Sequence, residues 1–192
     1  MRSERREEVL RAAMEVFAER GYRATSIDAV AERAGLTRQG VLHYYPSKKR
    51  LLLALLHFRE ELNRENVSGG TDVPDVPGRF AEAVAFEQEH PCLAQVHSVV
   101  MAEAVTGQEP AGEYARERRR TLQNHLTRLL TERYGDRLPS GLPAATAATA
   151  LLALVEGIQQ QWLVDQDCDR YPGVVRDALV VLLGTEKVPA QT

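Results

Sequence analysis

Residues 37–43 of this chain carry side chains that can recognise the edges of DNA base pairs. An arginine can pair with guanine through two parallel hydrogen bonds, and a glutamine can do the same with adenine. We therefore expect Arg38 and Gln39 to read bases directly. Thr37 and His43 belong to the same segment, at its first residue and on its outer face, so they would lie beside the two readers.

A second group of side chains has the chemistry of phosphate contacts, which set register without reading sequence. Lys48, Lys49 and Arg50 would occupy the first turn of a helix, where each cation costs about 0.3–1 kcal/mol against the helix dipole, and a phosphate would reverse that sign. A solvated basic face is the plain alternative, and Tyr44 could equally be an aromatic at the edge of a core. The predicted phosphate contacts are Thr25, Ser26, Thr37, Tyr44 and Lys48.

Three short helices must position these residues. A first helix is expected over residues 3–20, ended by Gly21. A second begins at TSID, where Thr25 has capping-box spacing to Asp28, and its apolar face consists of Ile27, Val30, Ala31 and Ala34. Gly35 then allows a turn within one residue, and Thr37 can cap the third helix, RQGVLHYY. Helix, glycine turn and short helix form the geometry that lets the last helix enter the major groove.

The run TSIDAVAERAGLTRQGVLHYYPSKKRLL resembles the DNA-binding segment of the tetracycline-repressor (TetR) family, and the resemblance covers about residues 5–56. It implies an Ω-shaped homodimer with a three-helix DNA-binding domain and a helical C-terminal domain that binds ligand and dimerises. The chain departs from the family where bases are read. Gln39 replaces a usual glycine, Gly40 follows it, and the frequent Leu-Tyr pair becomes Leu42-His43.

The rest of the chain is predicted to be helical because apolar residues recur at three- and four-residue spacing. After Pro46, Ser47 can cap a helix that continues to about Asn66, and the stretch SGGTDVPDVPG is expected to be a loop. We predict an all-α fold of about nine helices, with a helix-turn-helix domain over 1–46 and a ligand-binding and dimerisation domain over 47–192. The later helices are expected at 79–89, 92–106, 111–134, 143–164 and 172–184.

The last two predicted helices favour dimerisation. The run LLALVEGIQQQWLVDQD is similar to the penultimate helix of several TetR-family regulators, which implies a four-helix bundle with a second copy. Apolar stripes at helical spacing agree with this. The expected dimerisation residues are Leu151, Val155, Ile158, Trp162, Val175, Leu179 and Leu182.

The effector pocket is expected among the middle helices, by the same resemblance. Aromatic residues and methionine at helical spacing are otherwise ordinary core. The chain has two cysteines, Cys92 and Cys168, without metal-site spacing, and we predict no metal and no cofactor. The expected ligand-binding residues are His57, Phe58, Phe86, His97, Met101, Gln123 and Trp162.

Charge is distributed unevenly along the chain. Residues 1–50 hold 11 Lys/Arg against 7 Asp/Glu, whereas the remainder holds 13 against 20. The net charge of -3 therefore combines a basic N-terminal part with an acidic remainder. No apolar run approaches the roughly 20 residues that span a bilayer, and the N-terminus lacks a signal-peptide pattern. We expect a cytoplasmic protein without a membrane partner.

Together these features predict a sequence-specific transcription regulator. We expect a homodimeric repressor that binds a palindromic double-stranded operator and is released by a small-molecule effector. The alternatives are a regulator that binds DNA constitutively without an effector, and an enzyme. The enzyme alternative is disfavoured because the chain has no nucleophile elbow, P-loop, dinucleotide fingerprint or H-E-x-x-H motif.

Overall fold

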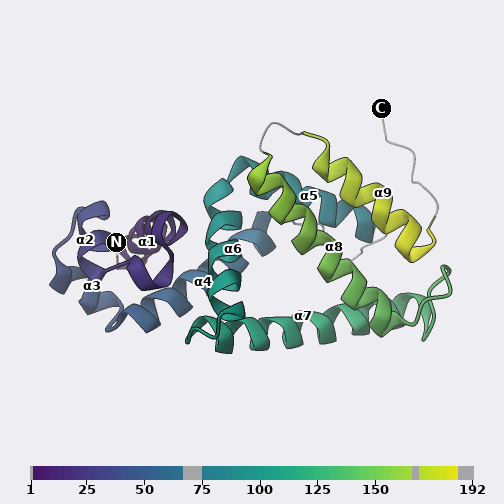
Figure 1. Ribbon diagram of the computed structural model, residues 1–192, viewed down its shortest axis with the longest axis horizontal. Helices are drawn as coiled ribbons and strands as arrows, with labels where there is room; N and C mark the ends of the chain where they lie inside the picture. Colours follow the sequence, from purple (N-terminus) through teal and green to yellow (C-terminus); the bar gives the residue numbers. More distant parts are fainter. Residues whose placement is uncertain (1, 67–74, 166–168, 186–192) are drawn as a thin grey trace. The chain divides into compact units, whose positions relative to one another are not determined.

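The computed structural model describes residues 2–66, 75–165 and 169–185, and in these ranges the chain folds into nine helices (Figure 1). The predicted all-α class is confirmed, and most helix ends lie within a few residues of the expected ones. The helices are α1 (Arg2–Ala24), α2 (Ile27–Arg33), α3 (Arg38–Tyr44), α4 (Lys48–Asn66), α5 (Val76–Glu89), α6 (Pro91–Val105), α7 (Ala111–Tyr134), α8 (Ala144–Val164) and α9 (Tyr171–Leu183).

The helices pack as two compact units. Among the described residues, the N-terminal unit comprises 2–66 and 90–116, and the C-terminal unit comprises 75–89, 117–165 and 169–185. The N-terminal unit therefore contains α4 and α6 in addition to the three helices expected to bind DNA. This division describes packing, and the functional boundary after residue 46 stays a prediction.

The N-terminal unit is organised around α1. This helix contacts α2, α4 and α6, while α3 packs on α2. Its apolar residues fall on one side because they recur at helical spacing, and this places them against the neighbouring helices. The fully buried side chains include Val9, Ala13, Val30, Val41, Leu51, Leu52, Leu55, Leu56, Ala94 and Val96.

The C-terminal unit is built from α5, α8 and α9, together with most of α7. Helix α9 packs on both α5 and α8. Leu151, Val175, Leu179 and Leu183 are fully buried there. No helix in the described ranges has the length and apolar composition needed to cross a membrane.

The expected loop around residues 68–78 is partly wrong. Residues 67–74 lie outside the described part of the chain, but Val76, Pro77 and Gly78 form the first turn of α5. Asp75 stabilises this start because its Oδ1 accepts the N–H of Gly78 at 2.9 Å. A proline is tolerated here because the first-turn N–H groups have no helical partner. Pro77 therefore lies in the first turn of a helix and not in a loop.

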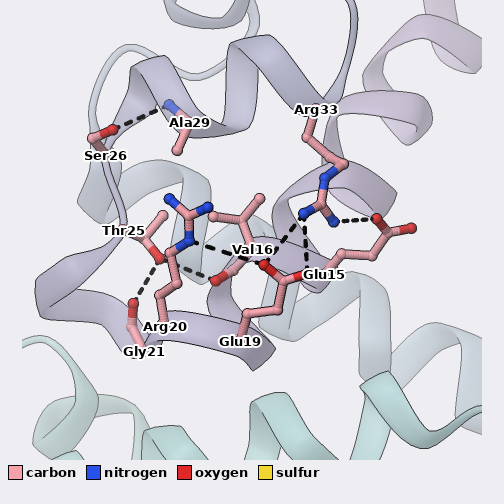
Figure 2. A network of polar contacts seen from close by, with 9 residues as sticks. All are labelled: Glu15, Val16, Glu19, Arg20, Gly21, Thr25, Ser26, Ala29 and Arg33. Carbon is pink, nitrogen blue, oxygen red and sulfur yellow. Dashed lines mark hydrogen bonds and ion pairs between the residues drawn. The ribbon is translucent and has the colours of Figure 1, made fainter.

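The N-cap of α2 also differs from the prediction. Ser26, and not Thr25, occupies the cap: its backbone is extended and its Oγ accepts the N–H of Ala29 at 3.1 Å (Figure 2). The Thr25 hydroxyl points inward instead and donates to the Gly21 carbonyl at 2.7 Å, and the side chain is 2% exposed. The hydroxyls of Thr25 and Ser26 could each accept a first-turn N–H group, and the burial of Thr25 leaves Ser26 as the cap.

Candidate nucleic-acid interface

The turn between α2 and α3 is closed by two backbone hydrogen bonds. Gly35 adopts a φ of +62°, its N–H bonds the carbonyl of Glu32 at 3.2 Å, and the N–H of Leu36 bonds that of Ala31 at 2.9 Å. This is a Schellman ending, which needs a residue with positive φ and thus favours glycine. Thr37 caps α3 at once, since its Oγ1 accepts the N–H of Gly40 at 3.1 Å. The predicted turn and cap are confirmed.

Helix α3 is anchored from its inner face. Val41 is fully buried, and Tyr45, at the C-cap, is 5% exposed. The Tyr45 hydroxyl donates to the carbonyl of Arg6 at 3.3 Å, and the guanidinium of Arg6 lies over its ring. Burial raises the pKa of Tyr45, so the hydroxyl stays a neutral donor near pH 7. These contacts fix which face of α3 points to solvent.

The outward face of α3 carries the predicted base readers. Thr37, Arg38, Gln39 and His43 are all exposed, and Tyr44 is partly buried beside His43, whose ring meets it edge-on at 5.2 Å. The structure thus brings five predicted DNA contacts together on α3 and its N-cap. A seven-residue helix with a free outer face and a capped first turn has the dimensions to lie in a major groove.

Arg38 already has one partner. Its Nη1 donates to Asp28 Oδ2 at 2.6 Å, and both side chains are more than half exposed. Exposed ion pairs contribute about 0–1 kcal/mol, because water and salt screen them. A guanidinium has five N–H donors, so the remaining donors of Arg38 stay available for a base edge.

Helix α2 is tied to α1 at its C-terminal end. Arg33 donates to Glu15 at 2.6 Å and to Glu19 at 3.0 Å (Figure 2). Its hydrogen bonds to Glu15 and Glu19 raise the pKa of Arg33 above its usual range. Together with the inward Thr25 hydroxyl, this bridge holds the helix that supports α3 at both of its ends.

Lys48 is used differently from what the sequence suggested. Its ammonium donates to three backbone carbonyls at the end of α1, those of Tyr22 at 2.7 Å, Thr25 at 2.9 Å and Arg23 at 3.3 Å. It also lies 4.4 Å from the centre of the Tyr22 ring. An ammonium has three donors, so these carbonyls match its full capacity. Its predicted contact with phosphate stays a prediction, and the structure adds a role inside the fold.

The neighbouring cations complete the start of α4. Ser47 caps the helix, as predicted, because its Oγ accepts the N–H of Arg50 at 3.2 Å. Lys49 pairs with Glu113 of α7 at 3.2 Å, whereas the Arg50 side chain is exposed. Of the three cations that a phosphate was expected to stabilise, Lys48 and Lys49 therefore have protein partners.

A family model described as "Bacterial regulatory proteins, tetR family" matches residues 9–55. This range runs from α1 through the capped turn and α3 into α4. The DNA-binding segment of this chain is therefore similar to that of the tetR family. The family model describes regulatory proteins, which favours a regulator over the enzyme alternative.

Individual proteins are also similar to parts or all of this chain. The transcriptional activator FasR of Mycolicibacterium smegmatis is 46% identical over 55 residues, which is 29% of this chain and 25% of FasR. A TetR-family regulator structure from Rhodococcus sp. has a TM-score of 0.75 at 22% identity, covering 94% of this chain and 99% of that one. A SmeT–triclosan complex has a TM-score of 0.75 at 21% identity, covering 98% of each chain. The structures show the fold, while the chain matches about a quarter of the length of FasR.

The predicted ligand-binding residues fall into both compact units. His57, Phe58, His97 and Met101 belong to the N-terminal unit, and Phe86, Gln123 and Trp162 to the C-terminal unit. His97 and Trp162 are 2% and 4% exposed. Gln123 bonds the carbonyl of Ala145 and the hydroxyl of Thr149, which ties α7 to α8. Ligand binding by these residues stays a prediction.

One pocket brings two of these residues together. It has a volume of about 490 Å³ and is lined by residues of α1 and α4 and by Tyr45. His57 and Phe58 both line it, and the guanidinium of Arg11 lies 5.6 Å from the centre of the Phe58 ring. Its walls are mixed apolar and charged, with Arg6 and Glu61 among them.

The predicted dimerisation residues are mostly inside the chain. Leu151, Ile158, Trp162, Val175 and Leu179 are at most 4% exposed, so they form the core of the C-terminal unit, while Val155 and Leu182 are partly exposed. Residues on the outer faces of α8 and α9 are more open to a partner. Val164, Val174 and Val181 are 90%, 43% and 77% exposed.

Sequence reasoning missed several structural partners of the interface. Glu103 of α6 accepts hydrogen bonds from backbone N–H groups about 80 residues earlier, at Tyr22 and Arg23. Arg59 is 2% exposed, and its Nε donates to the carbonyl of Leu93 at 2.6 Å, which ties α4 to α6. No local pattern marks either residue. Asp28 was noticed only for capping, although its spacing from Arg38 suits an ion pair across the turn.

Proposed function

We propose that this protein is a sequence-specific DNA-binding transcription regulator, acting as a homodimeric repressor that a small-molecule effector releases from its operator. The observation that carries the proposal is the capped α2–turn–α3 pair, which directs Thr37, Arg38, Gln39 and His43 to solvent inside the segment that matches the tetR family. A protein that acts on bacterial DNA works in the cytoplasm, as the sequence predicts.

Base reading is assigned to the start of α3. Arg38 pairs with guanine and Gln39 with adenine in the major groove, while Thr37 and His43 contact the bases and backbone beside them. Ser26 and Tyr44 are assigned to phosphate, because they flank the same exposed surface. The Thr25 hydroxyl supports this surface from within, since it bonds to the Gly21 carbonyl.

Two copies are needed because one seven-residue helix makes few base contacts. A symmetric dimer places its two recognition helices about 34–36 Å apart, so the operator is a palindrome with half-sites one helical turn apart. Exposed valines on α8 and α9 support this assembly. Effector binding shifts a population between two arrangements of the recognition helices, which changes their spacing. SmeT, a protein of similar fold, was solved with triclosan, which supports a small-molecule effector.

The test starts with selection of binding sites from random duplexes by the purified full chain. The recovered site should be palindromic, and fluorescence anisotropy should show affinity falling steeply with salt. A transcription reporter carrying that site then measures the sign of regulation. Constant affinity across an effector library would favour the constitutive regulator, whereas a chain that ignores every duplex at low salt would overturn DNA binding itself.

The role of Arg38 is tested by Arg38→Ala on the selected site and on single-base variants. We expect discrimination at one guanine to fall about 5- to 150-fold, since a bidentate pair contributes about 1–3 kcal/mol. Arg119→Ala is the matched control, because Arg119 is exposed on α7 and far along the chain from α3. Unchanged discrimination in Arg38→Ala would contradict the assignment.

A further inference from the structure

The backbone between α1 and α2 is held by charged side chains from two other helices. It begins at Gly21, whose φ of 73° and ψ of 177° break the helical path of α1. Residues 22–25 then lead directly to Ser26, the N-cap of α2. We call residues 21–25 the α1–α2 joint. Because α3 packs on α2, the position of the joint influences the position of the recognition helix.

The N–H groups of the joint are held from α6. Glu103 Oε1 accepts the N–H of Tyr22 at 2.9 Å and that of Arg23 at 3.2 Å. A Cβ at position 21 would lie 3.0 Å from the same oxygen, which shows how closely the carboxylate approaches the joint, and the positive φ of Gly21 favours glycine there. A carboxylate that accepts two backbone N–H groups makes charge-assisted hydrogen bonds, which are stronger than neutral ones.

The carbonyl groups of the joint are held from α4. Lys48 Nζ donates to the carbonyls of Tyr22, Arg23 and Thr25, and its charge lies over the Tyr22 ring. That ring in turn stacks on Phe17, with centroids 6.1 Å apart. Tyr22 and Arg23 are therefore bonded on both sides, through N–H to a carboxylate and through C=O to an ammonium. Displacing either α4 or α6 must move the joint or break these hydrogen bonds.

We infer that Glu103 and Lys48 are positioning residues that couple α6 and α4 to the recognition helix, and that Lys48 acts on DNA binding through the joint and not by contact with phosphate. The inference rests on the proposed function and adds to it the residues through which a shift of α4 or α6 reaches α3. A cation at the start of a helix is expected to bind phosphate, whereas this inference gives Lys48 a partner inside the protein.

Salt dependence separates the two roles of Lys48. A plot of log affinity against log salt has a negative slope, and loss of one phosphate contact makes it less steep by about 0.9. Loss of a joint contact instead lowers affinity and leaves the steepness unchanged. We expect Lys48→Met to bind the selected duplex at least about fivefold more weakly, the lower end of typical coupling between sites, with the wild-type slope. A slope reduced by about one at unchanged thermal stability would overturn the inference.

Lys48→Arg keeps the experiment decisive if Lys48→Met folds poorly. Arginine keeps the charge and binds phosphate well, but its planar fork cannot place three donors on converging carbonyls as an ammonium does. We expect weaker binding at the wild-type slope. Wild-type affinity in a folded Lys48→Arg protein would support a phosphate contact and overturn our assignment.

Glu103→Ala tests the other side of the joint. We expect faster amide hydrogen exchange at Tyr22 and Arg23 and at least about fivefold weaker DNA binding. The control Glu32→Ala removes an exposed carboxylate from α2 and should not weaken binding. Exchange that quickens at these amides without any loss of affinity would overturn the coupling.

The double variant Glu103→Ala/Lys48→Met completes the cycle. Because both residues act on one segment, we expect their losses of affinity to be less than multiplicative. Fully independent losses would contradict a shared joint. If the wild-type chain binds no duplex, the proposed function fails, while exchange at Tyr22 and Arg23 still reports whether Glu103 holds the joint.

Discussion

At the scale of single residues, the cations of the N-terminal unit differ in how many of their donors are occupied. Lys48 places its ammonium on three carbonyls, whereas Arg38 bonds one exposed carboxylate. Carbonyls at the end of a helix are good partners for a cation because the dipole is negative there. A base edge can therefore compete for Arg38 more easily than a phosphate can compete for Lys48.

Asp28→Asn tests how Asp28 restrains Arg38. We expect affinity for non-specific duplexes to rise about two- to fivefold, because a negative charge near the phosphates is removed and Arg38 is released. The free energy of unfolding should fall by less than about 1 kcal/mol, since Ser26 and not Asp28 caps α2. Anisotropy and urea unfolding measure the two effects, with Glu32→Gln as the equal-charge control. Weaker non-specific binding would count against this view of Asp28.

At the scale of helices, short elements depend on their ends. Helices α2 and α3 have seven residues each, too few to be stable alone in water. Hydroxyl caps at Ser26 and Thr37 satisfy N–H groups in their first turns, and such caps contribute about 0.5–2 kcal/mol each. Helix α5 uses a carboxylate instead, and Asp75 also pairs with Arg176 of α9 at 2.8 Å.

Asp75 makes the start of α5 sensitive to acid. Burial acts to raise its pKa, but the Gly78 N–H and the Arg176 guanidinium outweigh burial and hold the pKa below its ordinary value of 3.8. The stabilising effect is therefore complete above about pH 4 and is lost as the pH falls through the folded-state pKa. We expect Asp75→Asn to lower the free energy of unfolding by up to about 1 kcal/mol at pH 7. Below pH 4 the free energy of unfolding of the variant should fall less with decreasing pH than that of the wild type.

Urea unfolding between pH 7 and pH 2.5 measures this effect. The control is Asp136→Asn, which removes an exposed carboxylate from the connection between α7 and α8. An Asp75→Asn protein with the wild-type dependence on acid would show that this carboxylate does not contribute.

At the scale of the whole molecule, the outer faces of α8 and α9 are the candidate surfaces for the proposed dimer. Val164 and Val181 are 90% and 77% exposed, so both side chains are accessible to a second copy of the chain. The residues that the sequence assigned to this interface mostly fill the interior instead. A wide apolar stripe on a helix can thus serve the chain's own core before any interface.

Val181→Asp tests the proposed dimer. A carboxylate placed in an apolar interface loses its hydration without gaining a partner, so we expect the dimer to dissociate at least about tenfold more readily. Sedimentation velocity across a concentration series measures this. Val105→Asp is the matched control, because Val105 is 88% exposed at the end of α6 in the N-terminal unit. If Val181→Asp and wild type dimerise equally, this part of α9 does not belong to the dimer interface.

The local sequence was sufficient for the elements of the DNA-binding segment. Gly35 and Thr37 identify the turn and the cap because both depend on backbone φ and on hydrogen bonds within three or four residues. The predicted bounds of α7 match the observed ones, those of α3 differ by one residue, and Arg38, Gln39 and His43 were correctly expected on an exposed face. These features require no knowledge of distant residues.

Only the tertiary structure decided how the polar side chains are used. Thr25 and Ser26 are equal candidates for a cap until packing buries one of them, and Lys48 suits a phosphate until the end of α1 presents three carbonyls to it. Glu103 accepts the backbone N–H groups of Tyr22 and Arg23, which lie some 80 residues earlier in the sequence. Hydrogen bonds and ion pairs depend on distances of a few ångströms, and distances between residues far apart in the chain are set by the fold.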